Sequence, residues 1–247
     1  MRPLVLITGG SSGIGAAAAE LIAENDADVV INYRTNEQAA LAVKEKITSK
    51  GGTAYLVKAD ISTEEGVSHL FAEVDKIGTL GALINSAGVI STIHDFESTT
   101  LEQLNTVFTI NVFGSFLCSR EAVKRMSHRH GGNGGCIVNV SSMAASLGSP
   151  NEFVEYAASK GAIDTLTVGL AKEVARYGIR VNAVRPGLIN TDMHIHTGDA
   201  QRADRLAKFI PLERAGTAEE VAELIMWLIS EKSSYVCGAL YDVSGGR

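Results

Sequence analysis

The segment "LVLITGGSSGIGAAAAELIAE", residues Leu4–Glu24, decides how the rest of the chain is interpreted. It joins an apolar run of strand length, a glycine-rich turn and an alanine-rich stretch of helical length. Gly9, Gly13 and Gly15 follow the spacing G-x-x-x-G-x-G. Glycines permit positive φ angles and let a pyrophosphate approach the backbone N–H groups of a helix N-terminus. An ordinary strand-to-helix turn can show a similar pattern, but the position after a first strand favours dinucleotide binding.

Short apolar runs rich in β-branched residues alternate with helical stretches along the whole chain. The expected strands are Leu4–Thr8, Val29–Tyr33, Ala54–Lys58, Ala82–Asn85, Cys136–Val140, Ile179–Val184 and Ala239–Val243. The expected helices cover residues 14–25, 36–49, 63–77, 100–129, 152–177 and 218–230. Strands that are apolar on both faces and alternate with helices indicate a parallel α/β sheet covered on both sides. No linker, composition shift or repeat divides the chain, so we predict a single domain, residues 1–247.

The composition excludes several classes of protein. Of the 247 residues, 45% are hydrophobic and 20% are charged, which is ordinary for a soluble globular protein. A net charge of −6 argues against nucleic-acid or anionic-membrane partners, and no apolar run has the length of a membrane span. Cys118, Cys136 and Cys237 are odd in number and far apart, which argues against a disulfide framework or a zinc site. We therefore expect a cytoplasmic protein.

The stretch "FVEYAASKGAIDTL", Phe153–Leu166, places Tyr156 and Lys160 four residues apart, on one face of a helix. Taken alone, the pair could be a surface contact on an alanine-rich helix. A free phenol has a pKa near 10, so a tyrosine that acts as a base near neutrality needs a shift worth about 4 kcal/mol. An ammonium about 4 Å away at an effective dielectric constant near 20 supplies about 4 kcal/mol. Lys160 is therefore expected to lower the pKa of Tyr156 and make it a general acid/base.

Several motifs in the same order resemble the short-chain dehydrogenase/reductase family. Thr8–Gly15 resembles its T-G-x-x-x-G-I-G turn, "NSAG" at Asn85–Gly88 its N-N-A-G, and "YAASK" its Y-x-x-x-K. "RPG" at Arg185–Gly187 matches as well, so the resemblance covers the whole chain. Within the family the chain looks most like the bacterial sugar (glucose) dehydrogenases and 3-oxoacyl-[acyl-carrier-protein] reductases. The resemblance implies a Rossmann fold, a doubly wound parallel sheet of about seven strands with helices on both faces.

The resemblance implies four catalytic residues, which are Asn111, Ser142, Tyr156 and Lys160. Tyr156 would exchange the proton, Ser142 would orient the substrate oxygen, and Asn111 would hold a water that connects Lys160 to solvent. Ser142 lies fourteen residues before Tyr156, one more than is usual in the family, so Ser141 and Ser146 are alternatives for the same role. Without the family, Asn111 would be interpreted as a helical residue bonding a neighbour.

The resemblance and the strand ends together indicate a nicotinamide dinucleotide site. Its expected residues are Gly9, Ser11, Ser12, Gly13, Ile14, Gly15, Asn32, Tyr33, Arg34, Asp60, Ile61, Asn85, Ala87, Gly88, Tyr156, Lys160, Pro186, Gly187, Ile189 and Thr191. Individually, Asp60 could be a helix cap and Pro186–Gly187 an ordinary turn. Family members that prefer NAD place a carboxylate at the end of the second strand, where this chain has Arg34 and no acid before Glu37. We therefore expect a preference for NADP. NAD is expected to be usable as well, because Ser12 stands where many NADP-preferring members have a basic residue.

The resemblance implies an NADP- or NAD-dependent oxidoreductase that acts on a small alcohol or carbonyl compound, of the sugar/polyol or 3-oxoacyl type. A catalytically silent dinucleotide-binding scaffold or sensor is the alternative, and the intact catalytic set favours the enzyme. Residues 192–212 are expected to cover the substrate. His194 and His196 alternate in that segment, but two such residues are weak support for a metal, and no metal is expected. A homotetramer is the family expectation, with a small-molecule substrate and no nucleic-acid or membrane partner.

Overall fold

The computed structural model describes residues 3–193, 197–199 and 201–247. Seven strands form one sheet in the order β3-β2-β1-β4-β5-β6-β7, and all neighbouring strands are parallel. The strands are β1 Leu4–Thr8, β2 Asp28–Tyr33, β3 Thr53–Lys58, β4 Leu80–Asn85, β5 Gly135–Val140, β6 Ile179–Pro186 and β7 Leu240–Val243. The doubly wound parallel sheet predicted from the sequence is confirmed, and each strand agrees with its expected range to within two residues.

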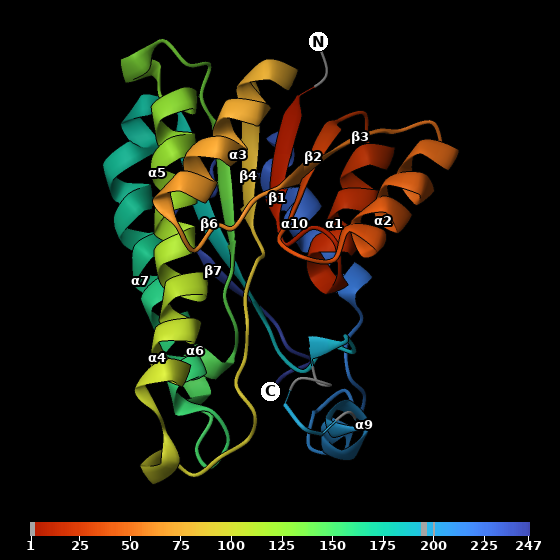
Figure 1. Ribbon diagram of the computed structural model, residues 1–247, viewed down its shortest axis with the longest axis vertical. Coiled ribbons are helices and arrows are strands. Elements are labelled where there is room, and N and C mark those ends of the chain that lie inside the picture. The colour runs from red at the N-terminus through yellow and green to blue at the C-terminus, as the bar shows by residue number, and fades with distance from the viewer. Residues whose placement is uncertain (1–2, 194–196, 200) are drawn as a thin grey trace.

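Helices cover both faces of the sheet (Figure 1). The helices on one face are α1 Gly13–Glu24, α2 Glu37–Ser49 and α10 Ala218–Ile229; on the other face they are α3 Glu64–Ile77, α4 Leu101–Phe108, α5 Ser115–Met126 and α7 Val154–Val174. Side chains of β1 alternate between the two cores: Val5 and Ile7 pack with the first group, and Leu4 and Leu6 with the second. This alternation is why Leu4–Ile7 of β1 are all apolar.

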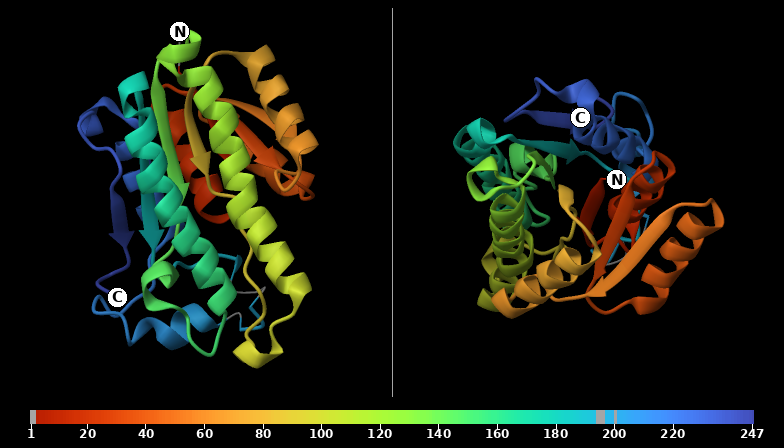
Figure 2. Two further views of the ribbon diagram at one scale, coloured as in Figure 1. Left: turned by 90° about the vertical axis from the view of Figure 1, so that its left-hand side faces the viewer. Right: turned by 90° about the horizontal axis from the view of Figure 1, so that it is seen from above.

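The helix expected over residues 100–129 is interrupted. A π-helical turn, η2 (Thr109–Gly114), separates α4 from α5, and α5 ends at Met126 before a short 3-10 turn at His128–His130. The combined run of α4 and α5 lies beside α7 (Figure 2). Two short helices, α6 (Ala144–Leu147) and α9 (Arg202–Ala207), have no counterpart in the prediction. Helical turns of the π type are rare and frequent at functional sites, and this one carries Asn111.

The order of the strands reverses at β1, because β2 pairs with one side of it and β4 with the other. Ligands of open parallel sheets bind outside the carboxyl ends of the strands at such a reversal. Threonine side chains at the starts of α3, α4 and α10 cap those helices, so their residue ranges are well defined. None of the described helices combines the length and the apolar character needed to cross a bilayer.

Candidate active site

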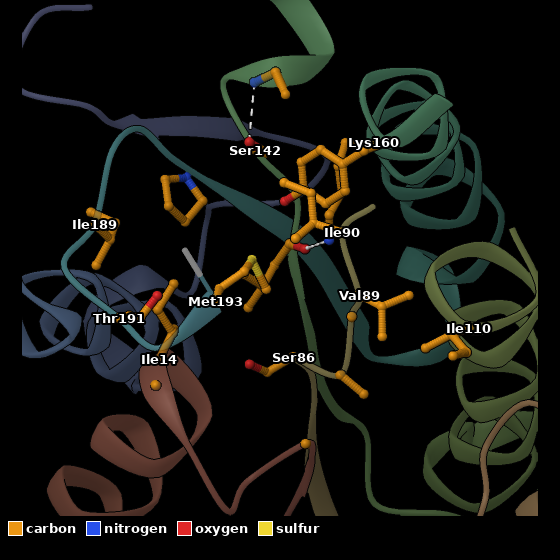
Figure 3. A pocket seen from close by; sticks show the side chains of 18 of the residues that line it. Ile14, Ser86, Val89, Ile90, Ile110, Ser142, Lys160, Ile189, Thr191 and Met193 are labelled. Atoms are coloured by element: carbon orange, nitrogen blue, oxygen red, sulfur yellow. Dashed lines mark hydrogen bonds between the residues drawn. The ribbon is translucent and has the colours of Figure 1, made fainter. Parts of the chain in front are cut away.

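A cavity of about 1190 Å³ lies at the carboxyl ends of the strands (Figure 3). Nearly all of the predicted site residues line it, namely Gly9, Ser11, Ser12, Gly13, Ile14, Asn32, Tyr33, Arg34, Asp60, Ile61, Ala87, Gly88, Ser142, Tyr156, Lys160, Pro186, Gly187, Ile189 and Thr191. Its volume exceeds the roughly 300–1,000 Å³ that is typical of a site for one small ligand. The cavity therefore has room for a dinucleotide and a second small molecule.

Gly15, Asn85 and Asn111 were also predicted as site residues and do not line the cavity. Gly15 lies directly behind the glycine turn, where a Cβ would collide with the backbone oxygen of Gly9. The side chain of Asn85 donates to Asn139 Oδ1 at 2.9 Å and to Ser119 Oγ at 3.0 Å, inside the protein. These residues support the walls of the cavity from behind.

The turn after β1 is shaped to approach a ligand with its backbone. Gly9 and Gly13 have φ angles of +64° and +51°, which other residues adopt only with strain. A Cβ on Gly9 would lie 2.7 Å from Ala87 Cα, so the turn packs tightly against the chain that follows β4.

The N-terminus of α1 opens at this turn. Ser12 is its N-cap, but its side chain makes no capping hydrogen bond, and the first turn of α1 contains no acidic residue. Free N–H groups and the positive end of the helix dipole therefore meet the cavity at Ser12, Gly13 and Ile14. This arrangement fits the pyrophosphate of a dinucleotide.

Polar residues at and just beyond the carboxyl ends of β2 and β3 line the dinucleotide end of the cavity. Asn32 donates to Ala59 O at 3.1 Å and Val57 O at 3.3 Å, so its amide joins β2 to β3. Arg34 is exposed at the cavity mouth. Burial opposes the ionisation of Asp60, but hydrogen bonding to Ser62 and the charge of Arg34 outweigh it and lower the pKa of Asp60. The Asp60 carboxylate thus keeps its charge, and it receives the Ser62 N–H at 2.9 Å.

Tyr156 and Lys160 lie on the first turns of α7, and both are buried and line the cavity. Figure 3 shows Lys160 in this wall. Lys160 Nζ donates to Val140 O at 2.8 Å and lies 5.6 Å from the centroid of the Tyr156 ring. Burial lowers the pKa of Lys160 to about 8, although the charge of Asp164 acts in the opposite direction. The amine therefore exchanges its proton near neutral pH.

The pKa of Tyr156 is raised by burial, against the opposing effects of a hydrogen bond with Ser142 and the charge of Arg202. We expected Lys160 to lower this pKa toward neutrality. That expectation is wrong, because burial raises the pKa of Tyr156 more than the neighbouring groups of the chain lower it. Desolvation acts on both residues, and the ammonium lies over the ring face rather than being a dominant neighbour of the hydroxyl. The phenol is thus the protonated form at neutral pH.

The loop after β5 distinguishes the three candidate serines. Ser142 lines the cavity, its Oγ accepts the Ala144 N–H at 3.1 Å, and its side chain acts to lower the pKa of Tyr156. Ser141 also lines the cavity, but its hydroxyl donates to the backbone oxygen of Lys160 at 3.2 Å; Ser146 is exposed and does not line the cavity. Of the three serines, Ser142 is the one whose side chain acts on the pKa of Tyr156.

Asn111 is buried and holds the chain that follows β4. Its Nδ2 donates to Val89 O at 2.9 Å and to Ser159 Oγ at 3.1 Å, and its Oδ1 accepts the Val89 N–H at 2.8 Å. A Cβ on Gly88 would lie 3.4 Å from Asn111 Oδ1 and 3.6 Å from Lys160 Nζ, so the two side chains meet at Gly88. The water-holding role of Asn111 stays a prediction.

Sequence reasoning missed the group at the opposite end of the cavity from the glycine turn. Arg202 and Glu152 both line the cavity and form an ion pair at 2.6 Å. The Arg202 guanidinium also lies 5.2 Å from the centroid of the Phe153 ring, which packs edge-on against Tyr156 at 5.9 Å. Fifty positions separate the two ion-pair partners, and α9 itself was not predicted, so no local pattern marked them.

His194 and His196, which were considered as metal ligands, lie outside the described residues. Within the described part of the chain, no group of three or more His, Cys, Asp or Glu side chains is placed to hold a metal ion.

Known proteins share this fold and these motifs. Residues 9–247 match the model of the family described as enoyl-(acyl carrier protein) reductase. The chain is 53% identical over 245 residues to "Uncharacterized oxidoreductase YgfF" of Escherichia coli, covering 99% of both chains. It is 36% identical over 242 residues to "Glucose 1-dehydrogenase 2" of Bacillus subtilis, covering 98% of this chain and 93% of that protein.

Two solved structures carry nicotinamide cofactors. A short-chain dehydrogenase from Burkholderia cenocepacia in complex with NADP has a TM-score of 0.91 at 31% identity, over 99% of this chain and 97% of that one. A 3-ketoacyl-(acyl-carrier-protein) reductase from Brucella melitensis complexed with NADH has a TM-score of 0.91 at 31% identity, over 99% and 98% of the two chains. The fold and the cavity define an oxidoreductase that binds a nicotinamide dinucleotide. The chain belongs to the short-chain dehydrogenase/reductase family, in the branch of the bacterial sugar dehydrogenases and 3-oxoacyl reductases.

Proposed function

We propose that this protein interconverts a small carbonyl compound and its alcohol, of the sugar/polyol or 3-oxoacyl type, with Tyr156 as the general acid/base. One observation carries the proposal: the Tyr156 phenol is buried in the same cavity as the glycine turn, and the neighbouring Ser142 side chain acts to lower its pKa. The bound nicotinamide supplies or accepts the hydride. What remains for the chain is to orient the substrate oxygen and to exchange one proton with it.

The residues around Tyr156 suit the reduction of a carbonyl. Because its pKa is raised, Tyr156 is protonated near neutrality and can donate its proton to the oxygen that becomes the alcohol. Ser142 orients that oxygen by hydrogen bonding. Lys160, with a pKa of about 8, carries positive charge beside the resulting phenolate and can return the proton. In the reverse direction the phenolate takes the proton of the alcohol.

The cofactor preference follows from the turn after β2. We infer that NADP binds more tightly than NAD, because Arg34 offers a charge-assisted contact to a 2′-phosphate and no carboxylate follows β2 before Glu37. The Arg34 charge acts on Asp60, which lies in the same end of the cavity.

Turnover distinguishes this proposal from a silent dinucleotide-binding scaffold or sensor. Purified protein is mixed with NADPH, or separately NADH, and a panel of sugars, β-keto esters and diketones, and loss of absorbance of the reduced cofactor is followed. Consumption that disappears in Tyr156→Phe establishes the oxidoreductase. Tight cofactor binding without turnover on any member of the panel, in either direction, favours the silent protein.

We also propose a homotetramer in the cytoplasm. Phe113 and Phe116, within the α4–α5 run, are about half exposed. Gly161 and Gly169 leave open space along α7. Two long helical surfaces can therefore accept other subunits. Burial raises the pKa of the Cys118 and Cys136 thiols to about 12 and about 11, which keeps them unreactive in a reducing compartment. Light scattering that gives four times the 26.1 kDa chain mass supports the tetramer, and a single-chain mass contradicts it.

A further inference from the structure

The ion pair between Arg202 and Glu152 lies in the wall of the cavity. Arg202 is the first residue of α9, and Glu152 lies in the connection between α6 and α7, just before Phe153. In this connection Ser149 and Asn151 have φ angles of +43° and +60°. The connection presents Glu152 to Arg202.

Arg202 is rigidly held. Its Nη2 and Nε contact the two carboxylate oxygens of Glu152 at 2.6 and 3.3 Å, and its side chain is only 8% exposed. A two-point contact of this kind fixes the plane of a guanidinium. Pairs buried to this degree add little net stability, because desolvation offsets the attraction. Stability therefore does not account for a buried cation in the wall of the cavity.

The cation is also close to the reacting group. The Arg202 guanidinium lies over the face of Phe153, and Phe153 contacts the Tyr156 ring with its edge. One aromatic ring thus separates the positive charge from the ring that must gain and lose a proton. In such a low-dielectric setting a fixed charge acts strongly on its neighbours.

We propose that Arg202 is a positioning residue for proton transfer: its positive charge stabilises the phenolate form of Tyr156, and Glu152 limits how much of that charge Tyr156 experiences. The inference rests on the proposed function, in which Tyr156 exchanges the proton. The hydroxyl also interacts with Ser142, and Arg202 is the charged residue in the described part of the chain that lowers the pKa of Tyr156.

Of the other charged groups near the site in the described part of the chain, Lys160 is the one that reaches the Tyr156 ring. Lys160 lies over the Tyr156 ring, and its neighbour Asp164 is held by Arg185 at 2.7 and 3.0 Å. Glu155, next to Tyr156 in the chain, faces His94 at 3.7 Å. The remaining charged residues that line the cavity are Arg34, Asp60, Asp192 and Arg247.

The two partners of the ion pair must have opposite effects. Oxidation of an alcohol requires Tyr156 without its proton, so kcat/KM in that direction rises as the pH passes the pKa of Tyr156. Removing the positive charge of Arg202 destabilises the phenolate and moves this rise to higher pH. Removing the negative charge of Glu152 leaves more of the Arg202 charge uncompensated and moves the rise to lower pH.

The test compares R202M, R202K and E152Q with wild type, using pH profiles of kcat/KM for alcohol oxidation. We expect R202M to shift the rise upward and E152Q to shift it downward, each by about half a pH unit or more, while R202K stays near wild type. E152Q keeps an amide oxygen for the guanidinium, so the geometry is preserved. R205M is the matched control, because Arg205 is a cation of the same helix that pairs with Asp199 and does not line the cavity.

A second measurement needs no turnover. The phenolate absorbance of Tyr156 is obtained as the difference between each protein and the same protein carrying Tyr156→Phe, and its midpoint is followed with pH. Opposite shifts in R202M and E152Q support the proposal. Equal midpoints in all variants, or shifts in the same direction, overturn it and leave the pair as a contact that holds α9. If wild type shows no turnover but the midpoints shift oppositely, the proposed function fails, and only the effect of the two charges on the ionisation of Tyr156 stands. If R202M does not fold, E152Q and R202K decide.

Discussion

The two ends of the cavity are built from different parts of the chain. At the end that fits the dinucleotide, the decisive features are backbone: the φ angles of Gly9 and Gly13 and the uncapped N-terminus of α1. At the other end they are side chains: Arg202 at the start of α9 and Glu152 in the connection before α7, fifty residues apart. A site made of backbone depends on a short contiguous motif, whereas a site made of side chains depends on how distant loops pack.

Tyr156 and Lys160 lie where these two ends meet, and each has an ion pair beside it. Arg202, paired with Glu152, lowers the pKa of Tyr156, and Asp164, paired with Arg185, raises the pKa of Lys160. Burial opposes both effects and outweighs them, so the pKa of Tyr156 is raised and that of Lys160 is lowered. The surrounding charges therefore favour a phenolate beside an ammonium, while desolvation favours the neutral pair. This balance keeps both groups able to exchange a proton.

The largest effect is expected at this meeting point. Tyr156→Phe keeps the aromatic ring, its contact with Phe153 and the shape of the cavity, but removes the exchangeable proton. We expect kcat to fall by about a hundredfold or more, with the affinity for NADPH changed little. Steady-state kinetics and cofactor titration measure the two quantities. A kcat within threefold of wild type would contradict the acid/base role and would place the chemistry elsewhere in the cavity.

The difference between the two ends explains what could be predicted from the sequence. Apolar periodicity predicts the strands and their parallel arrangement. The spacing of the glycines predicts the turn, because a turn with positive φ angles requires glycine. The break at Thr109–Gly114 could not be found, because a single π-helical turn within a helical run is too short to change the apolar periodicity visibly. The pairing of Arg202 with Glu152 depends on the tertiary packing of α9 against the connection between α6 and α7. The sign of the Tyr156 shift was missed because a charge can be read from a sequence, whereas the extent of burial cannot.

The second largest effect is expected for Lys160→Met, which removes the buried amine next to Tyr156. We expect kcat to fall more than tenfold because the phenolate loses its neighbouring charge. The affinity for NADPH should also fall, because the ammonium is expected to reach the nicotinamide ribose. Lys172→Met is a control on the same helix, since Lys172 is exposed and does not line the cavity.

The pH dependence sharpens the role of Lys160. Its pKa of about 8 is below the ordinary lysine value, so the amine is charged below pH 8 and loses its charge above it. Wild-type affinity for NADPH is therefore expected to weaken between pH 7 and pH 9, and Lys160→Met should remove most of this change. Fluorescence titrations at both pH values measure it. An equally strong pH dependence in the variant would contradict a contact between the ammonium and the cofactor.

A backbone substitution tests the end that is built from backbone. In Gly15→Ala the new Cβ collides with the backbone oxygen of Gly9, which cannot move without disturbing the turn. We expect the free energy of unfolding to fall by about 1–3 kcal/mol and cofactor affinity to fall with it. Urea denaturation compares the variant with wild type, and equal stabilities would show that the turn is not tightly packed.

The most selective effect is expected at the mouth of the dinucleotide end, where a side chain and not the backbone recognises the ligand. Arg34 is exposed, and loss of a charge-assisted phosphate contact typically costs about 1.5–3 kcal/mol. Arg34→Ala should therefore weaken NADPH binding by roughly tenfold or more and leave NADH binding nearly unchanged, because NADH has no 2′-phosphate. Lys58→Ala is the control, since Lys58 pairs in register with Tyr33 at the end of β3 but does not line the cavity. Both cofactors are titrated into wild type and both variants. Equal losses for the two cofactors, or a wild type that prefers NADH, would mean that Arg34 does not recognise the phosphate and that the preference is set by the backbone of the glycine turn.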